Sequence, residues 1–324
     1  MTIDPYLADL IDRMTDRSDS IIDMPDGTKQ SNSHAKFYNA YIEAKALNNT
    51  AYFEQLKHFI EKTKKEDLKQ KAYAILISIY ANTGEESIIN YVLDRLAVEQ
   101  KEWTLHTILF EIEHMKNPLP SHIFIDNILH LTTNKKHIVR DNAITCLKNT
   151  NNTKAEEKLI EIISHATDPF QLTYANGTLA KIGTQKSIPY LQKLTNHKQQ
   201  NVAASALGAI LKLSDSSYLP LFIEHLENGK LKYLGLEGVI RYGDKDVVPI
   251  IEKRVKELVS KKRAMQLYLS KDETELTFAM RFLTNYVAEF NSIKNLYQLL
   301  ITKKAALLWN NEIQWLNDNK KSFE

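Results

Sequence analysis

Apolar residues recur along this chain at intervals of three and four positions, the spacing that places them on one face of an α-helix. Strand-like alternation of apolar and polar residues is hard to find, and Leu, Ile, Ala, Lys and Glu dominate segments of helical length. Nine glycines and eight prolines are few for 324 residues. The pattern therefore predicts an all-α protein.

Four units in the second half of the chain share one register, which indicates internal repetition. The units begin at Val139, Gln171, Val202 and Leu231, so successive units are 32, 31 and 29 residues long. A period of this length predicts a pair of helices per unit. Small residues stand four and seven places after each start; they are Ala143, Ala175, Ala206 and Gly235, then Cys146, Thr178, Ala209 and Gly238.

This stripe of small residues predicts close packing between neighbouring helices. The next position in each unit is a large aliphatic residue, namely Leu147, Leu179, Ile210 and Val239. Small residues let two helices approach, and the adjoining aliphatic side chains fill the groove between them. Cys146, the single cysteine, is thus expected to be a core residue rather than a reactive thiol, and it excludes an internal disulfide.

The second helix of each pair starts near a proline, at Pro189, Pro220 or Pro249. A turn with Gly183, Ser214 or Gly243 precedes it, and Asp215 and Asp244 are placed to accept N–H bonds at the following helix start. An apolar ridge is predicted along these second helices through Leu159 and Ile163, Ile188 and Leu191, Leu219, Phe222 and Leu226, and Val248, Ile251 and Val255.

These residues resemble the HEAT-repeat family, in particular its short bacterial, PBS-lyase-type repeats. The matching segments are VRDNA at 139–143, LAKIGTQKSIPYL at 179–191, ALGAILKLSDSSYLPLF at 206–222 and VIRYGDKDVVPII at 239–251. The resemblance covers about a third of the chain and implies a right-handed α-α superhelix, a HEAT-like α-solenoid, while it says little about function.

Four segments are expected along the chain. Upstream of the clear repeats, helix pairs are predicted at 34–47 with 51–62 and at 68–79 with 88–96, followed by a weaker pair over 102–131 that NPLP interrupts. The segments are an acidic N-terminal stretch with a short helix and a turn (1–32), degenerate helical repeats (33–132), four HEAT-like repeats (133–260) and a helical C-terminal cap (261–324).

Charge is distributed unevenly. Residues 1–30 carry seven aspartates against Arg13, Arg17 and Lys29, a net charge of −4, so the +2 of the whole chain leaves +6 on the rest. The N-terminal stretch is predicted to be a short helix followed by a turn or connection, with an acidic arm that folds onto the body or a partner as the alternative. No basic and apolar leader is visible, and no apolar run approaches ~18 residues, so we expect a cytoplasmic protein without a membrane span.

Aromatic residues gather near the C-terminus. They are Phe278, Phe282, Tyr286 and Phe290 at four-residue steps, then Trp309 and Trp315. Aromatics at helical spacing are more often core than ligand contacts, so a capping layer is expected. The alternative is that one ring stays exposed and anchors a partner.

A candidate binding surface is predicted on the second helices, opposite their apolar ridge. In the HEAT-repeat family, which this chain resembles, this side of the second helices lines the concave surface. The polar and aromatic positions of this second-helix ladder are Lys158, Glu161, His165, Tyr190, Lys193, His197, Glu224, Asn228, Lys253 and Glu257, with Leu221 and Ile250 between them. Mixed charge signs favour a folded protein or peptide over a polyanion.

Nucleic acid is the alternative partner, since HEAT-like alkylpurine DNA glycosylases resemble this fold. Basic runs exist, at Lys62, Lys64, Lys65, Lys69 and Lys71, at Lys135, Lys136 and Arg140, and at Lys253, Arg254, Lys256, Lys261, Lys262 and Arg263. The mixed signs of the second-helix ladder argue against a phosphate-tracking groove, so these runs are interpreted mainly as solvated helix faces.

The sequence contains no motif that we recognise as catalytic. Deoxyhypusine hydroxylases resemble the fold and hold two irons with His-Glu dipeptides, but this chain has no His-Glu dipeptide. His106, His114, His122 and His130 are evenly spaced, yet eight residues rotate a helix by about 80° past two turns, so we interpret them as surface or partly buried residues. No metal, cofactor or catalytic residue is therefore predicted.

The sequence thus predicts a non-catalytic, protein-binding scaffold, with an inhibitor or immunity-type protein as its specific form. The Asn-, Lys- and Ile-rich composition is compatible with a bacterial source. A lyase or chaperone for a small chromophore or cofactor is a further alternative, because phycobilin lyases contain similar repeats.

Overall fold

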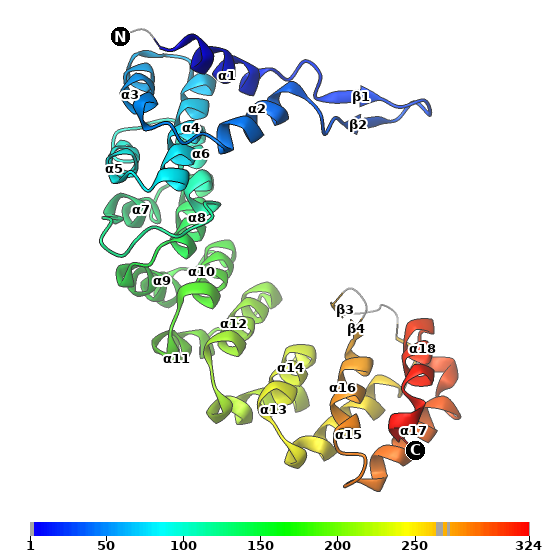
Figure 1. Cartoon of the computed structure of the whole chain (residues 1–324). Coiled ribbons are helices and arrows are strands. Elements are labelled where there is room, and N and C mark those ends of the chain that lie inside the picture. Colours follow the sequence, from blue (N-terminus) through cyan, green and yellow to red (C-terminus); the bar gives the residue numbers. More distant parts are fainter. Residues whose placement is uncertain (1–2, 264–267, 271–272, 324) are drawn as a thin grey trace. The chain divides into compact units, whose positions relative to one another are not determined.

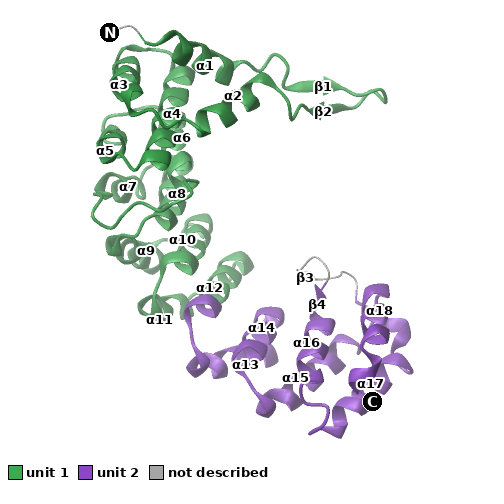
Figure 2. Ribbon diagram, viewed as in Figure 1, with its two compact units in different colours: residues 1–209 green, residues 210–324 purple. Residues whose placement is uncertain are grey.

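The computed structural model describes residues 3–263, 268–270 and 273–323. Residues 1, 2, 264–267, 271, 272 and 324, which belong to the predicted first and last segments, lie outside the described residues. The chain divides into two compact units, residues 1–209 (unit 1) and 210–324 (unit 2), with the boundary inside helix α12 (Figures 1 and 2). The four segment boundaries expected from the sequence stay a prediction.

Unit 1 is built from helices and one β-hairpin. Its elements are α1 (Pro5–Thr15), β1 (Ile21–Asp23), β2 (Lys29–Ser31), α2 (Lys36–Lys45), α3 (Phe53–Lys62), α4 (Glu66–Thr83), α5 (Glu86–Arg95), α6 (Glu102–Glu113), α7 (Asp126–Leu131), α8 (His137–Cys146), α9 (Thr153–His165), α10 (Pro169–Ile182), α11 (Ile188–Gln192) and α12 (Gln200–Leu213). Short 3-10 turns lie at Thr50–Tyr52, Leu147–Asn149 and Gln185–Ser187.

The helices of unit 1 form two rows. Helices α4, α6, α8 and α10 pack side by side in the first-helix row, and α3, α5, α7, α9 and α11 form the second-helix row (Figure 2). Polar contacts tie neighbours of the first-helix row together: Thr145 of α8 donates to Glu113 of α6 at 2.7 Å, and Thr178 of α10 donates to the Ile144 carbonyl at 3.2 Å. This is the stacked helix-pair architecture predicted from the sequence.

The predicted stripe of small residues lies in the core. All eight small residues of the four repeats are buried, and so are Leu147, Leu179, Ile210 and Val239. The predicted caps are also present, since Asp215 and Asp244 accept N–H bonds from Ser217 and Asp246 at the start of the next helical turn. The repeat register derived from the sequence is therefore confirmed.

Overpacking this stripe is expected to destabilise the stack. Ala206 in α12 is fully buried, so leucine at this position must displace the neighbouring side chains. We expect Ala206→Leu to lower the free energy of unfolding by about 1–3 kcal/mol, the usual cost of extra methylenes in a packed core. Chemical denaturation measures this change; an unaltered unfolding midpoint would show that the register is wrong.

The N-terminal stretch contains a β-hairpin that the sequence interpretation missed. After α1, strands β1 and β2 pair antiparallel, with Ile22 opposite Gln30. The turn closes because Gly27 adopts a positive φ of 81° and Asp26 accepts bonds from Thr28, while β-branched Ile21 and Ile22 favour extended backbone. Helix α2 packs on α1 and α4, which differs from the predicted pairing of 34–47 with 51–62.

Unit 2 continues with helix pairs and ends in a helical layer. It holds the end of α12 and then α13 (Leu219–Glu227), α14 (Lys232–Tyr242), α15 (Val248–Leu258), β3 (Tyr268–Ser270), β4 (Glu273–Thr274), α16 (Glu275–Thr284), α17 (Asn291–Ile301) and α18 (Asn310–Asp318). Short 3-10 turns lie at Ser216–Tyr218, Lys245–Val247, Ala305–Leu307 and Lys320–Phe323. Strands β3 and β4 pair antiparallel.

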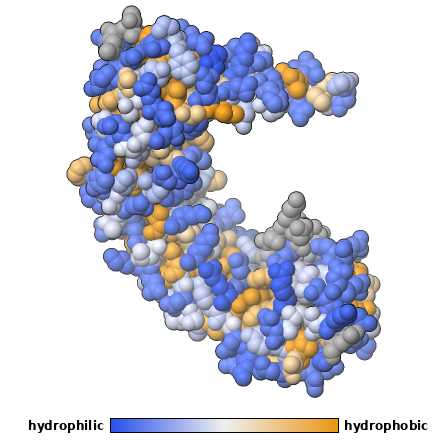
Figure 3. Space-filling view, in the orientation of Figure 1, coloured by the Kyte–Doolittle hydropathy of each residue, from blue (hydrophilic) through white to orange (hydrophobic). Residues whose placement is uncertain are grey.

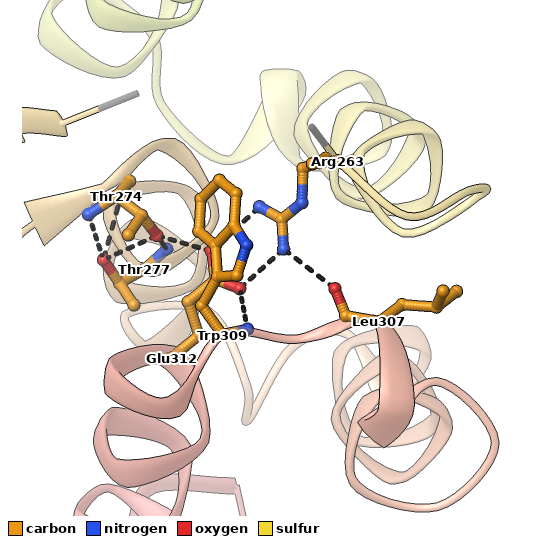
Figure 4. Close-up of polar contacts among 6 residues, drawn as sticks. All are labelled: Arg263, Thr274, Thr277, Leu307, Trp309 and Glu312. Carbon is orange, nitrogen blue, oxygen red and sulfur yellow. Dashed lines mark hydrogen bonds and ion pairs between the residues drawn. The ribbon is translucent and has the colours of Figure 1, made fainter. Parts of the chain in front are cut away.

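A buried ion pair fastens the last helix of unit 2 (Figure 4). Glu312 of α18 is fully buried and accepts two bonds from the guanidinium of Arg263, at 2.6 and 2.9 Å. The carboxylate also accepts bonds from Thr274 Oγ1 at 2.8 Å and from the Trp309 backbone N–H at 3.0 Å. The guanidinium lies over the Trp309 ring, 4.0 Å from its centre. One carboxylate therefore connects α18 to the starts of α16 and of its own helix.

Candidate protein-binding surface

The second-helix ladder is placed on the surface, in two separate sets. In unit 1, α9 carries Lys158, Glu161 and His165, and α11 with the turn after it carries Tyr190, Lys193 and His197. Lys158 pairs with Glu161 at 2.7 Å, and the Lys193 ammonium lies 5.3 Å from the centre of the Tyr190 ring. Tyr190 and Lys193 are exposed. These contacts are local, between residues of one helical segment.

In unit 2 the ladder residues lie on α13 and α15 and, for Asn228, at the end of α13. Glu224, Asn228 and Lys253 are exposed, and Glu257 is half-buried. Lys253 pairs with Glu227 at 2.9 Å, and Glu257 pairs with Lys232 at 2.8 Å and with Arg254 at 3.1 Å. The binding role of the ladder and its assignment to a concave surface stay predictions.

Exposed large apolar side chains are a second candidate, and those of the described residues lie in unit 1. They are Tyr6, Ile21, Ile22, Tyr38, Ile42, Val98, Trp103, Phe110, Phe124, Phe170, Tyr174 and Tyr190. Their neighbours are largely hydrophilic, as the scattered hydrophobic patches on the face drawn in Figure 3 show. Exposed apolar side chains mark a site of protein interaction only where several of them gather on one part of the surface.

Helix α6 presents a row of rings to solvent. Trp103 is 56 % exposed and Phe110 is 42 % exposed, although both belong to a helix whose other face is buried. His106 lies between them, with ring centres 5.5 Å from Trp103 and 5.8 Å from Phe110, and His114 continues the row 4.1 Å from Phe110. The row runs along α6 opposite Leu105, Ile108 and Ile112, which are buried. The indole and the phenyl ring are therefore held in place but not covered.

Helix α10 repeats this arrangement two places along the first-helix row. Phe170 is 69 % exposed and Tyr174, one turn later, is 41 % exposed. Leu172, Ala175 and Leu179 on the opposite side of α10 are buried in the stack. Helices α6 and α10 both pack on α8, and each carries its exposed rings on the side opposite its buried residues. We call Trp103, Phe110, Phe170 and Tyr174 the apolar face.

Helix α2 is linked to α6 by a polar contact at the buried Glu111. Glu111 of α6 accepts hydrogen bonds from the Tyr41 hydroxyl and, at 2.5 Å, from the Lys45 ammonium, both on α2. Burial raises the pKa of Glu111 to about 7 and lowers the pKa of Lys45. Tyr38 and Ile42 of the same helix are exposed.

The sequence interpretation did not find the apolar face, although a signal for it exists. Trp103 and Phe110 are seven residues apart, and both lie opposite the ridge of Leu105, Ile108 and Ile112. On an amphipathic helix, large rings on the side away from the ridge are expected to face solvent. The predicted ladder lies on second helices only, whereas the four rings of the apolar face lie on the first helices α6 and α10.

Several residues of the basic runs form ion pairs inside their own unit. In unit 1, Lys69 pairs with Glu99 at 3.4 Å, and Arg140 pairs with Asp168 at 2.6 Å. In unit 2, Arg254 pairs with Glu275 at 2.7 Å, and Arg263 with Glu312. Within the described ranges, no cluster of three or more His, Cys, Asp or Glu side chains is arranged to hold a metal ion. The evenly spaced histidines lie on α6, at its end, in a loop and on α7.

The C-terminal aromatic residues are packed rather than exposed. Phe282 is buried, and Phe278, Tyr286, Phe290, Trp309 and Trp315 are half-buried. Phe282 contacts Tyr286 with ring centres 5.2 Å apart, and Trp315 contacts Phe323 at 6.5 Å. Helix α16 ends at Thr284, before Tyr286, so the four-residue steps do not follow one helix to its end. This placement agrees with the predicted capping layer.

One protein family matches part of this chain. The family model described as HEAT repeats matches residues 125–212, which span α7 to α12. No curated protein matches the sequence. One similar solved structure is the crystal structure of an engineered protein from the Northeast Structural Genomics Consortium, with 12 % sequence identity, 98 % of each chain covered and a TM-score of 0.40. In the part of the chain that the structure describes, no helix is both long and apolar enough to cross a bilayer.

Proposed function

Because residues 125–212 of this chain are HEAT repeats, we propose that it is a non-catalytic scaffold that binds a folded protein or peptide through unit 1. The observation that carries the proposal is the concentration of exposed large apolar side chains in unit 1, with four of them on the apolar face. We expect the protein to work in the cytoplasm, with inhibition of an enzyme or toxin as its specific role.

The composition of the apolar face supports a protein partner. Tryptophan and tyrosine are enriched among the residues that dominate the affinity of protein interfaces. Their rings carry large contact area on few rotatable bonds, so little conformational entropy is lost when a partner covers them. The rigid helices behind them hold Trp103 and Phe110 in position before binding, which lowers the ordering cost further.

The surroundings of the apolar face speak against a polyanion. Glu66, Asp67 and Glu102 lie beside Trp103 together with Lys101 and Lys136, and Asp141 lies on α8, the helix that packs on both α6 and α10. Nucleic-acid interfaces bring many lysine and arginine side chains onto one face to neutralise phosphates. Here Arg140, the arginine of α8, already pairs with Asp141 at 3.0 Å and with Asp168.

Removal of the exposed rings is expected to abolish tight partner binding without unfolding the protein. The tagged protein and a Trp103→Ala/Phe110→Ala variant would be used for affinity capture from native lysate, with mass spectrometry as the readout. We expect a dominant partner whose affinity falls at least about tenfold in the variant, since buried interface aromatics are hot spots. The melting temperature should stay unchanged because both rings are exposed.

Two controls separate the candidate surfaces. Phe124→Ala removes an exposed ring in the loop before α7, outside the apolar face, and should leave capture intact. Tyr190→Ala/Lys193→Ala tests the second-helix ladder. If this variant alone loses the partner, the binding site lies on the ladder and not on the apolar face. If capture depends steeply on salt and is lost after nuclease treatment, the partner is a nucleic acid.

A further inference from the structure

A pocket of about 630 Å³ opens beside Trp103, where the N-terminal ends of α4, α6 and α8 meet. Its apolar lining comes from Trp103, Leu105 and Val139, and its charged lining from Glu66, Asp67, Glu102, Lys101 and Lys136. Pockets that hold small-molecule ligands have volumes of roughly 300–1,000 Å³, so this one has room for a single long side chain. Trp103 thus belongs both to the apolar face and to a cavity at its end.

The carboxylates of this pocket outnumber its cations. Glu66 accepts a bond from Thr104 Oγ1 at 2.5 Å, and Glu102 lies 3.6 Å from the Lys136 ammonium. Asp67 is exposed in the first turn of α4. The helix N-termini favour ionised carboxylates at these positions. With three acids against two lysines, the pocket has a net negative charge beside an accessible indole.

Unit 2 of the same chain contains the complete form of this arrangement. Arg263 lies over the Trp309 ring and forms a bidentate ion pair with Glu312, so one guanidinium contacts both an indole and a carboxylate (Figure 4). Guanidinium is planar, stacks on aromatic faces and bonds carboxylates through two parallel N–H groups. The pocket beside Trp103 has the indole and the carboxylates, but no arginine lines it among the described residues.

We propose that this pocket takes an arginine side chain of the protein partner, with its guanidinium stacked on Trp103 and paired with Asp67 and Glu102. The inference rests on the proposed function and names the chemistry of the partner's contact. Cation–π contact with tryptophan is stronger than with other rings, and each nearby carboxylate adds a charge-assisted bond. An arginine-bearing segment lying along α6 would then cover Phe110 as well.

The test uses the three indole N–H signals in the proton–nitrogen NMR spectrum of the full chain, with Trp103 assigned from a Trp103→Phe variant. N-acetyl-arginine amide is the probe, and N-acetyl-citrulline amide, which has nearly the same shape without the charge, is its matched control. We expect arginine to shift the Trp103 signal saturably and citrulline to bind at least about fivefold more weakly. The Trp309 and Trp315 signals should not move.

Charge variants of the pocket sharpen the test. Asp67→Asn/Glu102→Gln should weaken arginine binding at least about fivefold, whereas Lys101→Gln should strengthen it by removing a like charge. An arginine shift that is absent, equal to the citrulline shift or insensitive to both variants would overturn the proposal. Partner capture that depends on Trp103 and Phe110 but not on Asp67 and Glu102 would leave the proposed function standing while removing the arginine contact.

Discussion

Replacing Glu312 by glutamine is expected to lower the free energy of unfolding of unit 2 by about 3 kcal/mol, because it leaves a buried guanidinium without its counter-charge. Arg263 is largely buried and directs two N–H groups at Glu312, while Thr274 and Trp309 also donate to this carboxylate. Glutamine keeps the shape but turns one accepting oxygen into a donating amide. At least one of these donors must then lose its acceptor.

Urea unfolding followed by tryptophan fluorescence reports on unit 2, since Trp309 and Trp315 lie in unit 2 and Trp103 lies in unit 1. A Trp103→Phe background isolates the signal of unit 2. Lys245→Ala is the control, because its ion pair with Glu289, also in unit 2, is exposed on both sides and should contribute about 0–1 kcal/mol. Equal effects of the two substitutions would show that the Glu312 contact does not hold the last helix.

Gly238→Ala is expected to destabilise unit 2 by about 3 kcal/mol, at the upper end for overpacked cores. A Cβ atom at Gly238 would lie 2.1 Å from Cγ of Phe222, the inner end of a fully buried ring. Rotation of the ring about its Cβ–Cγ bond does not move Cγ, so Phe222 must leave its χ1 rotamer or α13 and α14 must separate. This loss exceeds the gain of about 1 kcal/mol that alanine brings over glycine inside a helix.

Gly177→Ala and Gly208→Ala provide matched controls with the opposite sign. Both glycines are helical, and a Cβ at either would meet nothing within 4 Å. These two variants should therefore raise the stability of their helices by about 0.5–1 kcal/mol. If Gly238→Ala were also stabilising in urea unfolding, the tight approach of α13 and α14 would be refuted.

The sequence predicted the repeats because their determinants are local and periodic. Small residues such as Ala206 and Gly238, followed by an aliphatic such as Ile210, recur at nearly constant intervals, and caps such as Asp244 act within a few residues. Such features follow from helix geometry alone. They fixed the class and the register, and the burial of the stripe confirms both.

The hairpin and the apolar face escaped prediction for different reasons. The hairpin depends on a short turn around Gly27 in a stretch where charge, rather than alternation, dominates the pattern. The apolar face has a sequence signal, since Trp103 and Phe110 lie opposite the apolar ridge of α6, but the predicted binding surface was confined to second helices. The Glu312 contact joins residues 49 positions apart, a separation over which one sequence carries no signal.

Cys146 gives the repeats a built-in reporter. It is the single thiol of the chain, it is completely buried, and burial raises its pKa, so thiol reagents find neither access nor thiolate in the folded state. The Cys146 thiol can be alkylated only after α8 separates from the helices that pack on it. The labelling rate, read as a mass increase of the intact protein, thus counts how often the middle of unit 1 opens, without any engineered probe.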